Sequence, residues 1–214
     1  MSLRYRTVTK NAAVEQVIER SRFIGRIAPV QSREEAETFI AGIRMDEKDA
    51  SHHVPAMVIG EQSNLQWGSD DGEPQGTAGA PLVQLLVKEG LTNVVLVVTR
   101  YFGGIKLGPG GLVRAYTSTG KLAIEAAGTS LVSELALWKL GVAYPYYGKI
   151  ENLASAEGAP FSIESANFGE CVILELAALS DELPLVRKRI ADITGGNYEE
   201  LELANILRPF PESG

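Results

Sequence analysis

Apolar positions along residues 1–130 alternate or repeat in ways that predict strands and helices in turn. Strands are expected at 4–8, 22–30, 54–60 and 93–99, with 65–67 as a hairpin partner of 54–60. The 93–99 strand is apolar on both faces, which is typical of a central buried strand. Ser32 at the N-cap with Glu35 at N3 forms a capping box, and Ala36, Phe39, Ile40 and Ile43 form one apolar stripe. Helices are therefore predicted from Ser32, from Pro81 to Gly90 and over 112–127.

Residues 131–214 have a separate pattern. A strand at 131–142, a helix at 144–157, strands at 160–165 and 170–178, a helix at 180–195 and a strand at 199–204 are expected. Ser180 is read as the N-cap of the second helix, and Gly195 and Gly196 as its stop. The order βαββαβ is the split pattern of ferredoxin-like domains. We therefore expect two α+β domains, at 1–130 and 131–214.

Charge separates the two predicted domains. Residues 1–130 hold 14 Lys/Arg and 14 Asp/Glu, whereas residues 131–214 hold 6 and 13, so the net charge of −7 lies in the second part. Clustered cations are what attract polyanions. The second domain is therefore a poor candidate for gripping phosphates, and the first can still carry a local basic patch.

Several classes of protein are disfavoured by what the sequence lacks. No apolar signal-peptide core follows the N-terminus, and no run of 18 apolar residues predicts a membrane span. With one cysteine the chain cannot form an intramolecular disulfide, and one cysteine with two histidines is too few for a typical zinc site. We expect a cytoplasmic protein with no membrane partner, no cofactor and no metal.

Two glycine-rich loops are the most informative segments. The first, residues 68–79, places Asp70, Asp71 and Glu73 among glycines. Three carboxylates in one turn could bind Mg²⁺ or work as acid and base, or they could form a solvated acidic turn.

The second loop, residues 100–111, follows the buried strand and leads into a helix. Free amides at a helix start attract anions, and Arg100, Lys106 and Arg114 add positive charge. No Gly-Lys-Ser/Thr ends the run, so it is not a Walker loop. The loop either binds an anion or is a tight turn that packs the helix. The two loops could also pair with each other, Asp70 or Asp71 with Arg100 or Lys106.

Other candidate chemistry is sparse. His52 and His53 are adjacent on a strand, so they point to opposite faces and cannot chelate one ion together. No nucleophile elbow or Cys/His pairing is apparent, and we expect no enzymatic activity.

Four segments resemble the YigZ/IMPACT family: SRFI at 21–24, ASHHVPA at 50–56, SDDGEPQGTAG at 69–79 and TRYFGGIKLGPGGLVRAY at 99–116. The match covers residues 18–128, and the tail from 131 resembles the C-terminal domain of bacterial members. Val54 stands where the family usually has a cysteine, which excludes a thiol role there.

The resemblance implies a fold for each domain and a role in the regulation of translation. The first domain would be like the second domain of a small-subunit ribosomal protein and domain IV of elongation factor G, with a left-handed βαβ crossover. The second would be like the ferredoxin-like end domain of that factor. Eukaryotic relatives restrain a stress kinase of translation initiation. The implied function is a non-enzymatic binding protein linked to the regulation of translation, through RNA, the ribosome or a translation factor.

Two alternatives stay open. One is a nucleotide-binding enzyme of kinase-like phosphoryl transfer or hydrolysis, with the second loop around phosphate and the acidic loop on Mg²⁺. The other is a protein-interaction module whose acidic second domain meets a basic partner. For the function that the family resemblance implies, the predicted binding residues are Asp70, Asp71, Glu73, Gly76, Thr77, Arg100, Tyr101, Phe102, Gly103, Gly104, Lys106, Gly108, Gly110, Gly111 and Arg114, with His52.

Overall fold

A computed structural model describes residues 3–211 of the chain, which divide into two compact units. The larger unit comprises Tyr5–Leu131 with residues 210–211, and the smaller comprises Val132–Pro209 with residues 3–4. Within the described residues the architecture is mixed α+β, with one sheet in the larger unit and a second sheet built around the smaller one. The α+β prediction is therefore confirmed.

The larger unit is built on a sheet of order β2-β3-β6-β4-β5. All neighbours in this sheet are antiparallel. Its strands are β2 (Ala12–Ile18), β3 (Ser21–Pro29), β4 (His52–Ile59), β5 (Leu65–Gly68) and β6 (Val94–Tyr101). β6 is central and almost wholly buried, as its apolar run predicts.

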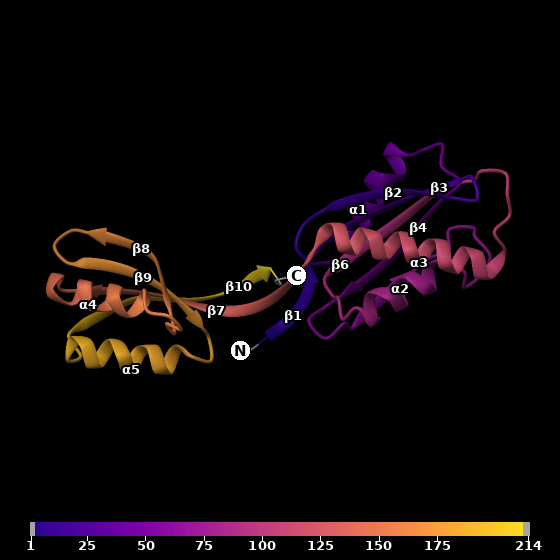
Figure 1. Cartoon of the computed structure of the whole chain (residues 1–214). Coiled ribbons are helices and arrows are strands. Elements are labelled where there is room, and N and C mark those ends of the chain that lie inside the picture. Colours follow the sequence, from indigo (N-terminus) through magenta and orange to yellow (C-terminus); the bar gives the residue numbers. More distant parts are fainter. Residues whose placement is uncertain (1–2, 212–214) are drawn as a thin grey trace. The chain divides into compact units, whose positions relative to one another are not determined.

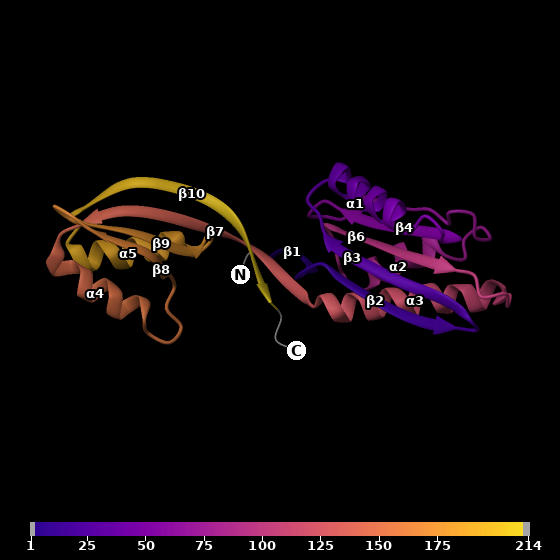
Figure 2. The same cartoon turned by 90° about the horizontal axis from the view of Figure 1, so that it is seen from above.

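Helices cover both faces of this sheet. α1 (Arg33–Asp46) packs on one face, where Ile40 and Ile43 meet Val95 and Val97. α2 (Gly79–Lys88) and α3 (Gly108–Ala127) pack on the other face, where the main core lies. Figure 2 shows α1 on one side of the strands and α3 on the other.

Because side chains alternate across a strand, each position of β6 belongs to one of these two layers. Leu96 and Val98 belong to the core under α2 and α3, whereas Val95 and Val97 belong to the core under α1. Arg100 therefore faces the α2 and α3 layer, and Tyr101 faces the α1 layer.

The smaller unit has the order β7-α4-β8-β9-α5-β10, as the predicted βαββαβ pattern requires. Its elements are β7 (Thr129–Val142), α4 (Tyr144–Ala154), β8 (Ser162–Phe168), β9 (Val172–Leu179), α5 (Leu183–Thr194) and β10 (Tyr198–Pro211). In this sheet the strand order is β1-β7-β9-β8, with β1 at Leu3–Val8, and β10 also pairs with β7. α4 and α5 pack together on one face over Trp138 and Leu174 (Figure 1).

Three local expectations were wrong. β2 was missed, because it is an edge strand whose turn to β3 uses Glu19 and Arg20 at positive φ rather than glycine. α3 begins at Gly108, four residues before the predicted start, because Pro109 suits a first turn and the following glycines accept helical geometry. Ser180 is not the N-cap of α5. Its amide donates to Glu134 O, which continues the sheet, and Glu182 is the cap.

Other local expectations are confirmed. Ser32 caps α1, with its Oγ accepting from the amide of Glu35. β5 pairs with β4 as a hairpin. Gly195 ends α5 in the left-handed conformation, with φ of 62°. The chain divides into its two units after Leu131.

Candidate functional site

The two glycine-rich loops are joined by a buried ion pair between Arg100 and Glu73. Arg100 Nη1 donates to Glu73 Oε1 at 2.7 Å, and the two side chains are only 5% and 4% exposed. Arg100 was predicted to add positive charge for an anion, but its place on β6 directs it under α3, where its charge is paired with Glu73. The predicted pairing of the loops is real, but its acid is Glu73 rather than Asp70 or Asp71.

Two further side chains gather at Glu73. Tyr116 of α3 donates its hydroxyl to Glu73 Oε1 at 2.7 Å, and His52 Nε2 lies 3.9 Å from the same oxygen. Burial and the hydrogen bond to Glu73 raise the pKa of the Tyr116 hydroxyl, so Tyr116 is neutral and is the donor. Tyr116 was not among the predicted binding residues. Tyr116 is the last residue of the TRYFGGIKLGPGGLVRAY segment at 99–116. Its place in that segment is the sequence feature that could have assigned it to the site.

Ser21 ties the second loop to the β2–β3 hairpin. Its Oγ accepts from Arg100 Nη2 and from the amide of Gly103, each at 3.2 Å. A Cβ on Gly103 would lie 2.0 Å from the carbonyl oxygen of Arg20, so only glycine fits there. Sequence reasoning did not assign Ser21 to the site, although it begins the SRFI segment.

Asp70 organises the first loop and the start of α2. Its carboxylate accepts hydrogen bonds from the amides of Gly76 (2.8 Å), Ala78 (3.0 Å) and Gly79 (2.8 Å). Burial would by itself raise the pKa of Asp70, but these amides outweigh it and hold the pKa below its ordinary value. Thr77 closes the same turn, with its hydroxyl donating to Pro74 O at 2.6 Å.

Asp71 is engaged elsewhere. One carboxylate oxygen accepts from Arg44 at 2.6 Å, and the other accepts from the amide of His53 at 2.6 Å. Its carbonyl oxygen lies 2.8 Å from His52 Nδ1, which makes that nitrogen the protonated one when the ring is neutral. His52 and His53 do lie on opposite faces, as expected.

The three carboxylates of the acidic loop have different partners and do not converge on one point. Asp70, Asp71 and Glu73 each bind a different set of protein groups, and within residues 3–211 no cluster of three His, Cys, Asp or Glu side chains is placed to hold a metal ion. Its carboxylates serve to fix the loops in place.

Tyr101 lies on the α1 side of the sheet, away from Arg100. Its hydroxyl bonds to the Glu47 carboxylate, which also binds Arg26, and the Arg22 guanidinium lies 4.9 Å from the Tyr101 ring centroid. The hydrogen bond to Glu47 raises the pKa of Tyr101, and it lowers the pKa of Glu47. Tyr101 is therefore apart from the other predicted binding residues.

Lys106 and Arg114 are the cations that remain free at the second loop. Both are exposed, and neither side chain has a hydrogen-bond or ion-pair partner within the part of the chain that the structure describes. They flank the start of α3, which has no side-chain cap and no acid in its first turn. Gly104 and Gly108 adopt positive φ beside them, and Gly110 and Gly111 lie in the first turn.

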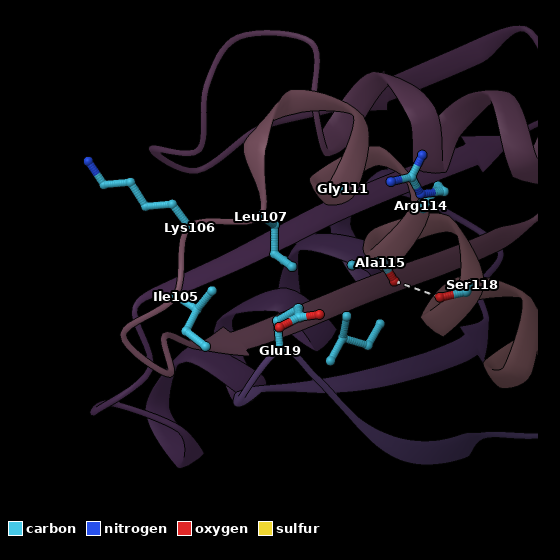
Figure 3. Close-up of a pocket in the computed structure, with 9 residues that line it drawn as sticks. Glu19, Ile105, Lys106, Leu107, Gly111, Arg114, Ala115 and Ser118 are labelled. Atoms are coloured by element: carbon cyan, nitrogen blue, oxygen red, sulfur yellow. Dashed lines mark hydrogen bonds between the residues drawn. The ribbon is translucent and has the colours of Figure 1, made fainter.

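Two hollows lie on either side of the segment from Ile105 to Leu107. One, of about 300 Å³, is lined by Glu73, Arg100 and Phe102 and by the first turn of α3. The other, of about 450 Å³, lies between the β2–β3 turn and α3 and is lined by Glu19, Lys106 and Arg114 (Figure 3). In Figure 3 the Lys106 side chain extends away from the other residues drawn. The Lys106 side chain therefore lies at the edge of this hollow, and Arg114 lines it from α3.

No helix in the described part of the chain is both long enough and apolar enough to cross a membrane.

Comparison with known proteins places these loops in a family. The model of the Impact N-terminal domain matches residues 19–124. "IMPACT family member YvyE" of Bacillus subtilis is 36% identical, over 91% of this chain and 89% of its own. "IMPACT family member YigZ" of Escherichia coli is 33% identical, over 89% and 93%.

More distant similarity extends to eukaryotes and to a solved structure. "Protein IMPACT" of mouse is 38% identical over 42% of this chain and 29% of its own length. A crystal structure of a hypothetical protein is 30% identical, with a TM-score of 0.62 over 95% of this chain and 99% of that one.

Both bacterial relatives align along nearly their whole length, and the domain match spans the paired loops from the β2–β3 turn to α3. The chain is therefore a member of the IMPACT family.

Proposed function

We propose that this protein is a non-enzymatic binding protein that acts on translation in the cytoplasm by binding the ribosome or its RNA. The surface assigned to this role is the start of α3 with Lys106 and Arg114. One observation carries the proposal: these two cations flank an uncapped helix start and have no partner among the described residues. Free amides and cations together attract phosphate.

The buried part of the loops supports a structural role rather than a catalytic one. Glu73, Arg100 and Tyr116 satisfy one another beneath the surface, and Asp70 and Asp71 are bound by backbone amides and Arg44. Such a network positions Lys106 and the first turn of α3. A kinase-like reaction would need carboxylates free to hold Mg²⁺, so we propose no catalysis.

We also infer the finer folds of the two units. β3 and β4 flank β6 and are both antiparallel to it, which supports the βαβ arrangement of the second domain of a small-subunit ribosomal protein. The β10-β7-β9-β8 neighbours of the smaller unit support a ferredoxin-like fold.

Ribosome co-sedimentation of the full chain at low and high salt tests the function. We expect retention at low salt, release at high salt, and loss of retention in the double variant Lys106→Ala/Arg114→Ala. Lys188→Ala/Arg189→Ala is the matched control, because it removes two exposed adjacent cations from α5 of the acidic unit. It should bind as the wild type does.

The proposal fails if no ribosome or RNA is retained at low salt, or if both double variants reduce binding equally. A rise in melting temperature with ATP and Mg²⁺ would instead favour a nucleotide-binding enzyme.

A further inference from the structure

The smaller hollow at the second loop, lined by Glu73, Arg100 and Phe102, has a size and lining suited to one planar ring. Its volume of about 300 Å³ is at the lower end for ligand pockets. Most of its lining is apolar or aromatic, from Pro74, Phe102, Leu107, Pro109 and Leu112. A nucleic-acid duplex or a helix does not fit such a space, whereas a single planar ring does.

Phe102 supplies a prearranged aromatic surface at this hollow. The Arg100 guanidinium lies over two rings, with its Cζ 5.4 Å from the centroid of Phe23 and 5.4 Å from that of Phe102. The amide of Phe102 donates to Ser51 Oγ at 3.1 Å. Arg100 is itself held by Glu73 and Ser21, so the Phe102 ring rests on a fixed support.

Phe102 nevertheless remains 49% exposed. A large ring that is anchored on one side and open on the other loses little entropy when something stacks on it. Burying its free surface would also recover apolar area that is now in water.

The charged residues that line this hollow are Glu73, Arg100 and Lys106, and of these only Lys106 is exposed. Glu73 and Arg100 both line the hollow and neutralise each other as an ion pair, so together they offer no net charge to a phosphate there. Lys106 lines this hollow and the neighbouring one, and Arg114 lines the second. Glu19 also lines the second hollow and offsets part of the positive charge there. Lys106 and Arg114 therefore supply the positive charge around the two hollows, and Leu107 lies between them in the lining of the second hollow.

We propose that this hollow receives one unstacked base of a single-stranded RNA, which stacks on Phe102 while flanking phosphates lie on Lys106, Arg114 and the start of α3. Aromatic stacking of splayed bases beside cations is the general mode of single-strand recognition. The inference rests on the proposed function and specifies its ligand.

Fluorescence anisotropy of the full chain tests the proposal, with a labelled single-stranded 12-mer RNA of mixed sequence and a duplex of the same length. We expect the single strand to bind at least tenfold more tightly than the duplex. Phe102→Ala should weaken single-strand binding by roughly tenfold, because one stacked base is lost. Phe168→Ala is the control, since Phe168 is an exposed ring of the smaller unit and is 59% exposed.

Two additional measurements separate stacking from charge and from folding. Phe102→Leu keeps the apolar contact with the loop and removes the ring, so it should keep the melting temperature and still lose binding. Lys106→Ala/Arg114→Ala should flatten the dependence of log K on log salt by up to about 1.4, at roughly 0.7 per phosphate contact on a single strand. Phe102→Ala should leave that slope unchanged.

The base-insertion proposal is overturned if the duplex binds as tightly as the single strand, or if both Phe102 variants bind within twofold of the wild type. If ribosomes are retained but free RNA is not, the contact is to protein, and the proposed function survives without this inference. If neither is retained, both fail.

Discussion

Arg100 and Glu73 lie 27 residues apart in sequence and form a buried ion pair of 2.7 Å that joins the two glycine-rich loops. Tyr116 donates to the same carboxylate oxygen, and Ser21 accepts from the other end of the guanidinium. The pair thereby connects β6, the first loop, α3 and the β2–β3 hairpin. The exposed cations at the start of α3 are presented by this buried network.

Removing one member of the pair should be costly. We expect Glu73→Ala to lower the free energy of unfolding by about 3–5 kcal/mol, because Arg100 would be left as a buried charge without its acid. Urea denaturation measures this loss. Tyr116→Phe removes only one hydrogen bond to Glu73 and should cost about 1 kcal/mol. Equal losses in the two variants would contradict the view that the charge pair dominates.

The Asp70 carboxylate should make the first loop sensitive to acid. Asp70→Asn places an amide where two carboxylate oxygens now accept three backbone N–H groups, and should cost about 1–2 kcal/mol at neutral pH. The pKa of Asp70 is lowered from 3.8. Its contribution is therefore fully present above that value and is lost as pH falls through the lower folded pKa.

Unfolding of the wild type and of Asp70→Asn across this range measures the effect. The difference in stability between the two proteins should shrink below roughly pH 4. A difference that stays constant down to pH 2 would show that the ionised carboxylate is not what the amides require.

His53 should give the protein a second pH dependence. Burial lowers the pKa of His53 from 6.5, and Arg44 adds to this effect while Asp71 and Glu47 oppose it. The folded state therefore favours the neutral ring. Its contribution to stability is complete above pH 6.5 and declines as pH falls from 6.5 towards the lower folded pKa.

Chemical denaturation between about pH 5 and pH 8 measures this decline. We expect His53→Gln to flatten the slope of stability against pH in this window. Retention of the full slope in His53→Gln would assign it to other groups.

Gly103 should be intolerant of any side chain. A Cβ there would meet the Arg20 carbonyl at 2.0 Å, so Gly103→Ala must push the second loop away from the hairpin. We expect the free energy of unfolding to fall by about 1–3 kcal/mol or more, as for overpacked cores.

Gly110→Ala is the control, because the nearest atom to its Cβ is Arg114 Nη1 at 4.0 Å and the site is helical. It should be neutral or stabilising by up to about 1 kcal/mol. Thermal unfolding of the two variants distinguishes them, and a stable Gly103→Ala would contradict the close approach.

Much of the fold follows from local patterns. The Ser32 cap of α1, the two-sided apolar run of β6 and the glycine stop of α5 are each set by residues that are neighbours in sequence. Their physical cause is short-range hydrogen bonding and periodic burial, so they can be predicted from the chain. β2 escaped prediction because its weak alternation at a sheet edge is stabilised by pairing with β3.

The arrangement of the candidate site depends on the tertiary structure. Asp70, Asp71 and Glu73 have the same chemistry within four positions, and residue type alone does not say which of them meets Arg100. The alternation of β6 directs Arg100 beneath α3, where Glu73 and Tyr116 arrive from distant parts of the chain. Asp70 is instead taken by the amides that begin α2, and Asp71 by Arg44. A buried charge is stable only when the fold brings a partner of opposite charge beside it. Packing therefore determines that Arg100 is buried and paired, whereas Lys106 and Arg114 remain exposed to solvent.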